Sequence, residues 1–200
     1  MIYFDNAATS KNKPDVSYEA YMYYAQEIGT SPGRGSYKLG VQASRLLYQS
    51  RKTVNRFFGN PSKTNVVFTK NSTEAINLFL NGYLKKGDHV LISCYEHNAV
   101  LRPLHTLQEA EIITYSILPE EAIENPRGKL EEYIRPNTKL VAITLASNLT
   151  GQLVYNASIG ALCHSKGIAV FVDASQGGGK EIVKMDRDYI DFLAFTGHKD

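Results

Sequence analysis

The segment Val170-Phe171-Val172-Asp173-Ala174-Ser175-Gln176 decides the fold, together with the last ten residues, Asp191-Phe192-Leu193-Ala194-Phe195-Thr196-Gly197-His198-Lys199-Asp200. Each is a short run of branched and aromatic residues that becomes polar at its carboxyl end, which is typical of a buried parallel strand that delivers side chains to a crevice. One end carries an acid, Asp173, and the other carries an amine, Lys199. A lysine that forms Schiff bases and an acid that holds a pyridinium nitrogen are the two protein groups that pyridoxal phosphate chemistry requires. These two strand ends therefore predict a site for that cofactor.

Upstream of the two segments, the hydrophobic pattern alternates between helices and strands. It predicts a tyrosine-rich helix over 14–28 that ends at Gly29, and a second helix over 39–58 that is closed by Gly59 and Pro61. We then expect these elements in order: strand 65–69, helix 73–84, strand 89–93, helix 99–110, strand 112–117, helix 129–134, strand 140–145, helix 158–166, strand 168–172 and strand 190–195. Strands that alternate with helices predict an α/β fold of three layers, a mostly parallel sheet with helices on both faces. Because Pro103 lies beyond the first turn of its helix, we expect that helix to start late or to bend.

Composition excludes several classes of function. The chain has 200 residues, of which 43% are hydrophobic and 21% are charged, and this is ordinary soluble globular composition. Twenty-two basic residues against 20 acidic ones leave a net charge of +2, too balanced for a nucleic-acid-binding surface, so a small ligand is expected. No apolar run is long enough for a membrane span and no secretion signal is present, so the expected location is cytoplasmic. Cys94 and Cys163 lack C-x-x-C spacing, which predicts two buried free thiols and neither a disulfide nor a metal site.

Polar groups follow several of the expected strands. The stretch 68–77 reads as a strand, a turn and a helix start, with Asn71 as a candidate N-cap and with Ser72 and Thr73 where a helix N-terminus can bind phosphate. An ordinary capped helix without a ligand is the alternative. His97 can stack on a flat cofactor ring or serve as an exposed or capping histidine, and Asn148 can donate from its amide or simply form a turn. Taken together, these residues fall at the carboxyl ends of successive strands, where binding sites of α/β proteins form.

In order and spacing, six motifs resemble the cysteine desulfurase family of class V aminotransferases. They are Ile2-Tyr3-Phe4-Asp5-Asn6-Ala7-Ala8-Thr9, Phe68-Thr69-Lys70-Asn71-Ser72-Thr73-Glu74-Ala75-Ile76-Asn77, Glu96-His97-Asn98, Ser147-Asn148 with Gly151, Val172-Asp173-Ala174-Ser175-Gln176 and Phe195-Thr196-Gly197-His198-Lys199. The resemblance extends over the whole chain. It implies the large domain of a fold type I pyridoxal phosphate enzyme.

The resemblance also implies a role for each matching residue around the cofactor ring. Lys199 is similar to the Schiff-base lysine that carries the proton at the substrate Cα, and Asp173 resembles the partner of the pyridine nitrogen. Gln176 resembles the donor to the phenolic oxygen. His97 resembles the histidine that stacks over the ring and can also move protons.

A second group of matching residues is implied for the phosphate and the substrate. Asn148 is similar to the family amide near the phenolic oxygen and the substrate carboxylate, and Ala8 lies where the N-terminal segment lines the substrate pocket. The residues implied for the phosphate cup are Ser72, Thr73, Thr196 and His198. Asn71 stands where the family usually has glycine, which asparagine can meet because it tolerates left-handed backbone. Tyr37 stands where many relatives have histidine, which leaves a polar contact near the pocket mouth open.

The implied reaction converts L-cysteine to L-alanine and transfers sulfur to an enzyme cysteine, for sulfur metabolism and iron–sulfur cluster assembly. A homodimer and a sulfur-acceptor protein are the implied partners. By this resemblance, residues 1–200 are a large domain cut just after Lys199, and the small domain, the carboxylate-binding arginine and the sulfur-accepting cysteine lie beyond residue 200. The 200 residues alone are accordingly expected to be inactive.

Two alternatives stay open. One is another class V enzyme, an aminotransferase or a selenocysteine lyase, that uses the same cofactor site on a different substrate. The other is a catalytically silent fragment or interaction module. A dinucleotide-binding fold is disfavoured because no strand is followed by G-x-G-x-x-G.

Overall fold

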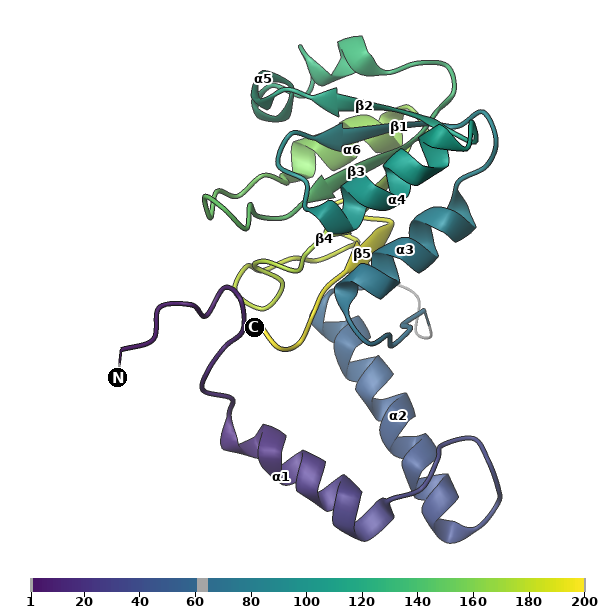
Figure 1. Cartoon of the computed structure of the whole chain (residues 1–200), viewed down its shortest axis with the longest axis vertical. Helices are drawn as coiled ribbons and strands as arrows, with labels where there is room; N and C mark the ends of the chain where they lie inside the picture. Colours follow the sequence, from purple (N-terminus) through teal and green to yellow (C-terminus); the bar gives the residue numbers. More distant parts are fainter. Residues whose placement is uncertain (1, 61–64, 200) are drawn as a thin grey trace. The chain divides into compact units, whose positions relative to one another are not determined.

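The computed structural model describes residues 2–60 and 65–199, and the chain divides into two compact units, residues 1–67 and 68–200. The first unit holds α1 (Asp15–Tyr23), the π-helical turn η1 (Tyr24–Ile28) and α2 (Lys38–Phe57) (Figure 1). Both helices predicted from the tyrosine-rich and amphipathic patterns are confirmed. The first ends at Gly29, whose φ of +52° is a left-handed conformation that glycine adopts without strain. Pro61, the predicted stop of the second helix, lies outside the described residues.

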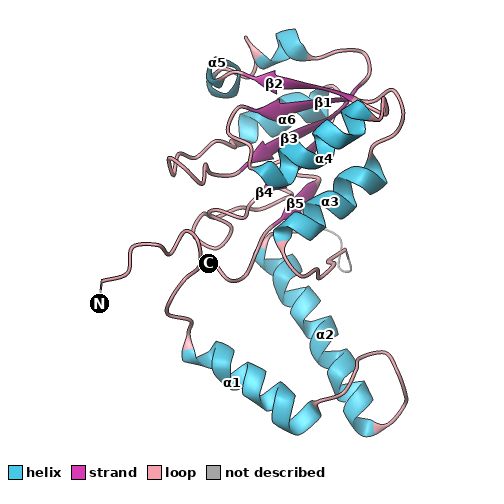
Figure 2. Cartoon of the chain, in the orientation of Figure 1, coloured by secondary structure: helices cyan, strands magenta, loops and turns pink. Residues whose placement is uncertain are grey.

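The second unit is built on a five-stranded parallel sheet, as the alternating pattern predicts (Figure 2). Its spatial order is β2-β1-β3-β4-β5, and each neighbouring pair runs parallel. The strands are β1 (His89–Ser93), β2 (Thr114–Leu118), β3 (Thr138–Thr144), β4 (Ala169–Asp173) and β5 (Phe192–Ala194). The short apolar runs of β1, β3 and β4 are buried on both faces, which is typical of central parallel strands, whereas β2 at one end of the sheet is partly exposed.

Helices cover the two faces of this sheet. They are α3 (Ser72–Tyr83), α4 (Asn98–Glu109), α5 (Glu120–Glu124), the 3₁₀ turn η2 (Leu130–Tyr133) and α6 (Ala157–Ser165). Figure 1 shows α3 and α4 on one face of the sheet and α6 on the other, which confirms the three layers. The sequence predicts a helix over 129–134, which is the 3₁₀ turn η2, and it gives no sign of α5.

The main hydrophobic core lies between the sheet and the pair α3 and α4. Alternate strand residues such as Val90, Ile92 and Phe171 pack there with Ile76 and Leu80 of α3. A ring stack extends this core, because Phe79 lies 4.8 Å from Phe171 and 4.4 Å from Phe192, measured between ring centroids. This packing places the N-terminal turn of α3 beside the strands that end at the predicted cofactor residues.

Two expectations about local structure are wrong. Residues 65–69 form no strand, and Val67 is 77% exposed. The helix with Pro103 begins at Asn98 and contains the proline, which excludes the late start and leaves the bend as a prediction. Cys94 is exposed because it follows the end of β1, whereas Cys163 is buried as expected, and both thiols are free. Among the described residues, no helix is both long enough and apolar enough to cross a membrane.

His89 begins β1 and is fully buried. Its ring nitrogens Nδ1 and Nε2 lie 2.8 Å from Thr138 Oγ1 and 3.0 Å from Ser116 Oγ. Burial, and secondarily the charge of Arg135, lowers the pKa of His89 to about 4. The fold therefore holds this imidazole neutral.

We expect the free energy of unfolding to fall by about 3 kcal/mol as the pH drops from about 6.5 to about 4, because the unfolded chain binds a proton at His89 that the fold excludes. The stability is fully present above the unfolded pKa and is lost below it. Denaturant titrations of the wild type and of His89→Gln over this pH range measure the effect. The substitution should flatten the dependence, and His105→Gln, at an exposed histidine paired with Glu109, is the control. An equal slope in wild type and His89→Gln would contradict the assignment.

Candidate active site

Parallel pairing brings the carboxyl ends of the strands to one edge of the sheet. At this edge, the candidate residues His97, Asn148, Asp173, Gln176, Thr196, His198 and Lys199 follow the four neighbouring strands β1, β3, β4 and β5. Backbone hydrogen bonds tie the last residues of these strands together: Leu145 N–H donates to the Asp173 carbonyl, and Ala174 N–H donates to the Ala194 carbonyl. Residues from four separate segments are thus held on adjacent strand ends.

The start of α3 adds Ser72 and Thr73. Asn71 is its N-cap, as the sequence predicts, and its Oδ1 accepts from Glu74 N–H at 2.8 Å while Glu74 Oε2 accepts from Lys70 N–H at 2.7 Å. This resembles a capping box, except that Glu74 accepts from the residue before the N-cap and not from the N-cap itself. Asn71 is extended, with φ −164°, so the suggestion that it replaces a family glycine in left-handed conformation is wrong. The N–H groups of Ser72 and Thr73 belong to the first turn, which has no acceptors inside the helix and attracts anions.

His97 is the N-cap of α4. Its Nδ1 accepts from Ala99 N–H at 3.1 Å, which leaves Nε2 as the nitrogen that carries the proton in the neutral ring. The side chain is exposed at the candidate edge of the sheet. A capping role and a place beside a ligand are therefore compatible.

Asp173 ends β4 and is only 3% exposed. Its Oδ1 accepts from Ser175 N–H at 3.0 Å and from Ser175 Oγ at 2.5 Å. Both of these hydrogen bonds reach the same oxygen, so they orient the carboxyl group without using Oδ2. Ser175 is not among the residues predicted for the site, although an acid that accepts from the residue two positions later is a recognised turn pattern.

The remaining candidates follow β3, β4 and β5. Thr196 is buried, Lys199 is half-buried, and His198 is exposed in the turn that precedes it. Asn148 is exposed in a loop whose backbone is held by Ser147, because Ser147 Oγ accepts from the N–H groups of the two residues after Asn148. Gln176 lies half-buried in the turn after β4.

Glu96 is a buried acid at this edge that the sequence analysis quoted without a role. Its Oε1 accepts from Ser93 Oγ at 2.5 Å and from Thr144 N–H at 2.7 Å, while Oε2 is buried and has no hydrogen-bond partner among the described residues. Burial and, secondarily, the charge of Asp173 raise the pKa of Glu96 to about 8. A glutamate next to a helix start normally points to solvent, so no sequence signal marked it.

Ala8 belongs to the other compact unit, where it lies in the turn that begins at Asp5 and donates its N–H to the Asp5 carbonyl at 3.1 Å. It is exposed within that turn. Its assignment to a substrate pocket stays a prediction.

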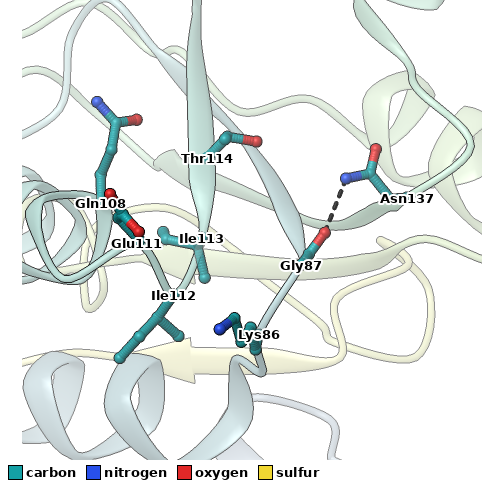
Figure 3. Close-up of a pocket in the computed structure, with 8 residues that line it drawn as sticks. All are labelled: Lys86, Gly87, Gln108, Glu111, Ile112, Ile113, Thr114 and Asn137. Carbon is teal, nitrogen blue, oxygen red and sulfur yellow. Dashed lines mark hydrogen bonds between the residues drawn. The ribbon is translucent and has the colours of Figure 1, made fainter.

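A hollow in the second unit lies at the opposite edge of the sheet (Figure 3). It is lined by residues that precede β1, β2 and β3: Lys86, Gly87, Gln108, Glu111, Ile112, Ile113, Thr114 and Asn137. Asn137 Nδ2 donates to the Gly87 carbonyl at 2.8 Å and closes one side. Because this hollow is at the amino ends of the strands, it contains none of the candidate residues.

Comparison with known proteins identifies relatives along the whole chain. The profile of the family described as "Aminotransferase class-V" matches residues 2–200. A probable cysteine desulfurase of Methanothermobacter thermautotrophicus is 34% identical over 199 residues, 99% of this chain and 49% of that protein. Cysteine desulfurase IscS of Shewanella denitrificans is 34% identical over 204 residues, 99% of this chain and 50% of that protein. The chain spans about half the length of these curated relatives.

Solved structures show the same fold. The apo structure of a cysteine desulfurase from Thermococcus onnurineus NA1 matches 98% of this chain and 50% of its own, with a TM-score of 0.85 and 31% identity. A structure described as SspA in complex with cysteine matches 100% of this chain and 58% of its own, with a TM-score of 0.85 and 25% identity.

Asn71→Ala should lower the free energy of unfolding by about 1 kcal/mol, because it removes the acceptor for Glu74 N–H at the start of α3. Denaturant titration of the second unit's cooperative transition measures this loss. The control is Asn81→Ala, at an exposed position of the same helix, where alanine's better helix propensity should leave stability equal or slightly higher. Equal effects of the two substitutions would show that the cap is not formed.

Proposed function

We propose that this chain, which belongs to the aminotransferase class-V family, is the cofactor-binding part of a pyridoxal phosphate-dependent cysteine desulfurase. The observation that carries the proposal is the pairing of β4 with β5. Asp173 ends β4 as an oriented, buried acid, and Lys199 lies in the turn that follows the neighbouring strand β5. An acid for a ring nitrogen and an amine for an aldehyde are the pair that the chemistry needs.

The residues at this edge fit pyridoxal phosphate by their chemistry. A carboxyl group with one oxygen occupied by Ser175 leaves Oδ2 for a ring N–H donor. The capped start of α3 offers N–H groups and the hydroxyls of Ser72 and Thr73 for a phosphate, and Thr196 and His198 are proposed to complete that cup. When bound, the cofactor supplies an electron sink for a negative charge that develops at the substrate Cα.

Each residue around the ring then has a defined task. Asp173 keeps a positive charge at the ring nitrogen, and Ser175 holds the carboxyl group in the orientation that this requires. Lys199 Nζ anchors the cofactor, and it removes and returns the proton at the substrate Cα. His97, whose Nδ1 caps α4 and whose Nε2 carries the proton of the neutral ring, is proposed to stack over the cofactor ring and to donate from Nε2.

Asn148 and Gln176 are proposed as amide donors to the cofactor's phenolic oxygen, and Asn148 also to the substrate carboxylate. Both lie after neighbouring strands, β3 and β4, which places them between the turns that carry His97 and Lys199. Ala8 is proposed to line the substrate pocket. These assignments derive from the family resemblance.

Cysteine is the proposed substrate. Relatives over the whole chain are called cysteine desulfurases, and one solved structure with the same fold is described with cysteine bound. The thiolate of an enzyme cysteine attacks the substrate sulfur, and the C–S bond breaks with its electron pair on carbon. A proton at that carbon then completes alanine, and the enzyme keeps a persulfide.

The two thiols of this chain are unsuited to accept that sulfur. Burial raises the pKa of Cys163 to about 12 and, more weakly, raises that of Cys94, whereas nucleophilic thiols have a lowered pKa. We therefore propose that the accepting cysteine lies in a part of the protein beyond residue 200. A homodimer, a sulfur-acceptor protein, a role in iron–sulfur cluster assembly and a cytoplasmic location complete the proposal.

Lys199→Ala should abolish the visible absorption band of bound pyridoxal phosphate and lower the release of sulfide and alanine from cysteine by about 10²-fold or more. The measurements are an absorption spectrum and a product assay on the protein as its gene encodes it. Lys166→Ala, at a lysine paired with Glu131 away from the candidate edge, should leave both unchanged. A normal band and normal turnover in Lys199→Ala would refute the function. If the wild type shows the normal band but turns over another amino acid and not cysteine, the result would favour a different class V enzyme.

Asp173→Asn should separate cofactor binding from chemistry. The amide oxygen can still accept both hydrogen bonds from Ser175, but the charge that holds the ring nitrogen protonated is gone. We expect kcat to fall by about 10²-fold while the affinity for pyridoxal phosphate falls much less. Steady-state kinetics and absorbance titration with the cofactor measure the two effects. Asp186→Asn, at an exposed acid, is the control, and an unchanged kcat in Asp173→Asn would disprove the role.

A further inference from the structure

Glu96 lies in the turn between β1 and α4, directly before His97. Its side chain is only 9% exposed, whereas the side chain of His97 is exposed. An ionisable side chain therefore points into the protein in the same turn that exposes His97. Such burial is rare unless the group is paired or held neutral.

The hydrogen bonds of Glu96 join two strands. Ser93 ends β1, Thr144 ends β3, and both donate to the same oxygen, Oε1, at 2.5 Å and 2.7 Å. The Thr144 donor is its backbone N–H, so the bond fixes the chain of β3 and not merely a side chain. Thr144 Oγ1 in turn donates to the Ala146 carbonyl at 2.9 Å, so the chain of hydrogen bonds continues toward the loop that carries Asn148.

Two observations indicate that Glu96 is protonated near neutral pH. It is buried, and Asp173 of β4 is a negative neighbour; together these raise the pKa of Glu96 to about 8, although the hydrogen bonds from Ser93 and Thr144 favour the ionised form. The Cys94 thiol of the same turn is a further titratable neighbour, and the pKa of that thiol is also raised. Since Oε1 receives two donors, the proton resides on Oε2.

We propose that Glu96 is a positioning residue of the candidate active site, a neutral carboxyl group that fixes the turn carrying His97 to the end of β3. The inference rests on the proposed function only in assigning His97 to that site. Neutrality matters because a second negative charge beside Asp173 would repel the carboxylate of Asp173. Glu96 itself touches neither substrate nor cofactor in this role.

The substitutions Glu96→Gln and Glu96→Ala test whether the turn is fixed by the hydrogen bonds to Glu96. Glutamine keeps the size, the accepting Oε1 and a neutral group, so the turn should stay fixed. Alanine removes the acceptor of Thr144 N–H, and we expect the hydrogen exchange of that amide to accelerate by about tenfold, the equivalent of one hydrogen bond. The NMR signal of the His97 ring should shift in Glu96→Ala and stay near its wild-type position in Glu96→Gln. Glu124→Ala, at an exposed glutamate, is the matched control for both readouts.

The protonation state has its own test, which also serves if Glu96→Ala fails to fold. In the wild type, isotope-edited infrared spectra should show the carbonyl stretch of a buried carboxylic acid at pH about 6 and lose it by pH about 10. This band should be absent in Glu96→Gln and retained in Glu124→Gln. The pKa of Glu96 is higher in the folded protein than in the unfolded chain. The free energy of unfolding of the wild type therefore falls as the pH rises from about 4.5 to about 8. Glu96→Gln should therefore gain thermal stability relative to the wild type across that interval.

These readouts are made on the protein without added cofactor, so they are independent of whether it is a desulfurase. Unchanged Thr144 exchange and an unchanged His97 signal in Glu96→Ala would overturn the proposal, and so would equal disruption by Glu96→Gln and Glu96→Ala. A carboxyl group that is already ionised at pH about 6 would overturn its neutral form. Failure of the proposed function shows itself differently, as a wild-type protein without a visible cofactor band while the hydrogen bonds to Glu96 are intact.

Discussion

Parallel pairing of the five strands is the constraint on which the candidate site depends. It sends each carboxyl end to the same edge, so turns that are far apart in sequence become neighbours. The apolar runs of the strands supply the energy that holds this arrangement, because Val90, Phe171 and their neighbours are buried under α3 and α4. The polar residues that follow the strands are then carried to the edge as a consequence of packing elsewhere.

The sequence predicts the parts of the fold that depend on local pattern. Short branched runs predict β1, β3, β4 and β5 to within about two residues, and the Asn71 cap follows from its spacing to Glu74. Prediction from local pattern fails where contacts with distant parts of the chain decide the structure. Residues 65–69 have the apolar pattern of a strand, yet they form none and Val67 is exposed, because an apolar pattern alone does not decide whether a segment joins a sheet. Cys94 shows the same limit, since one position past a strand end changes a buried thiol into an exposed one.

For the candidate site, the sequence points to residues by their chemical type and not by the hydrogen bonds that hold them. Lysine, histidine and aspartate at strand ends are conspicuous by type. Ser175 and Glu96 are not, because their importance lies in hydrogen bonds to Asp173 Oδ1 and to Thr144 N–H that only the folded chain creates. Ser175 was within reach, since its spacing to Asp173 is a known turn pattern. Glu96 was not, since no local rule places a glutamate inside the protein at a helix start.

Glu96 and Asp173 show how one strand edge can assign different roles to two buried carboxyl groups. Each receives two hydrogen bonds on one oxygen, so donor count does not distinguish them. Their surroundings do. Glu96 is enclosed between the ends of β1 and β3, and its burial beside Asp173 favours the protonated form. Asp173 ends β4 at the candidate edge, where we propose that its charge meets a cationic ring. In this proposal, one carboxyl group is a neutral support for the turn that carries His97, and the other is kept for chemistry.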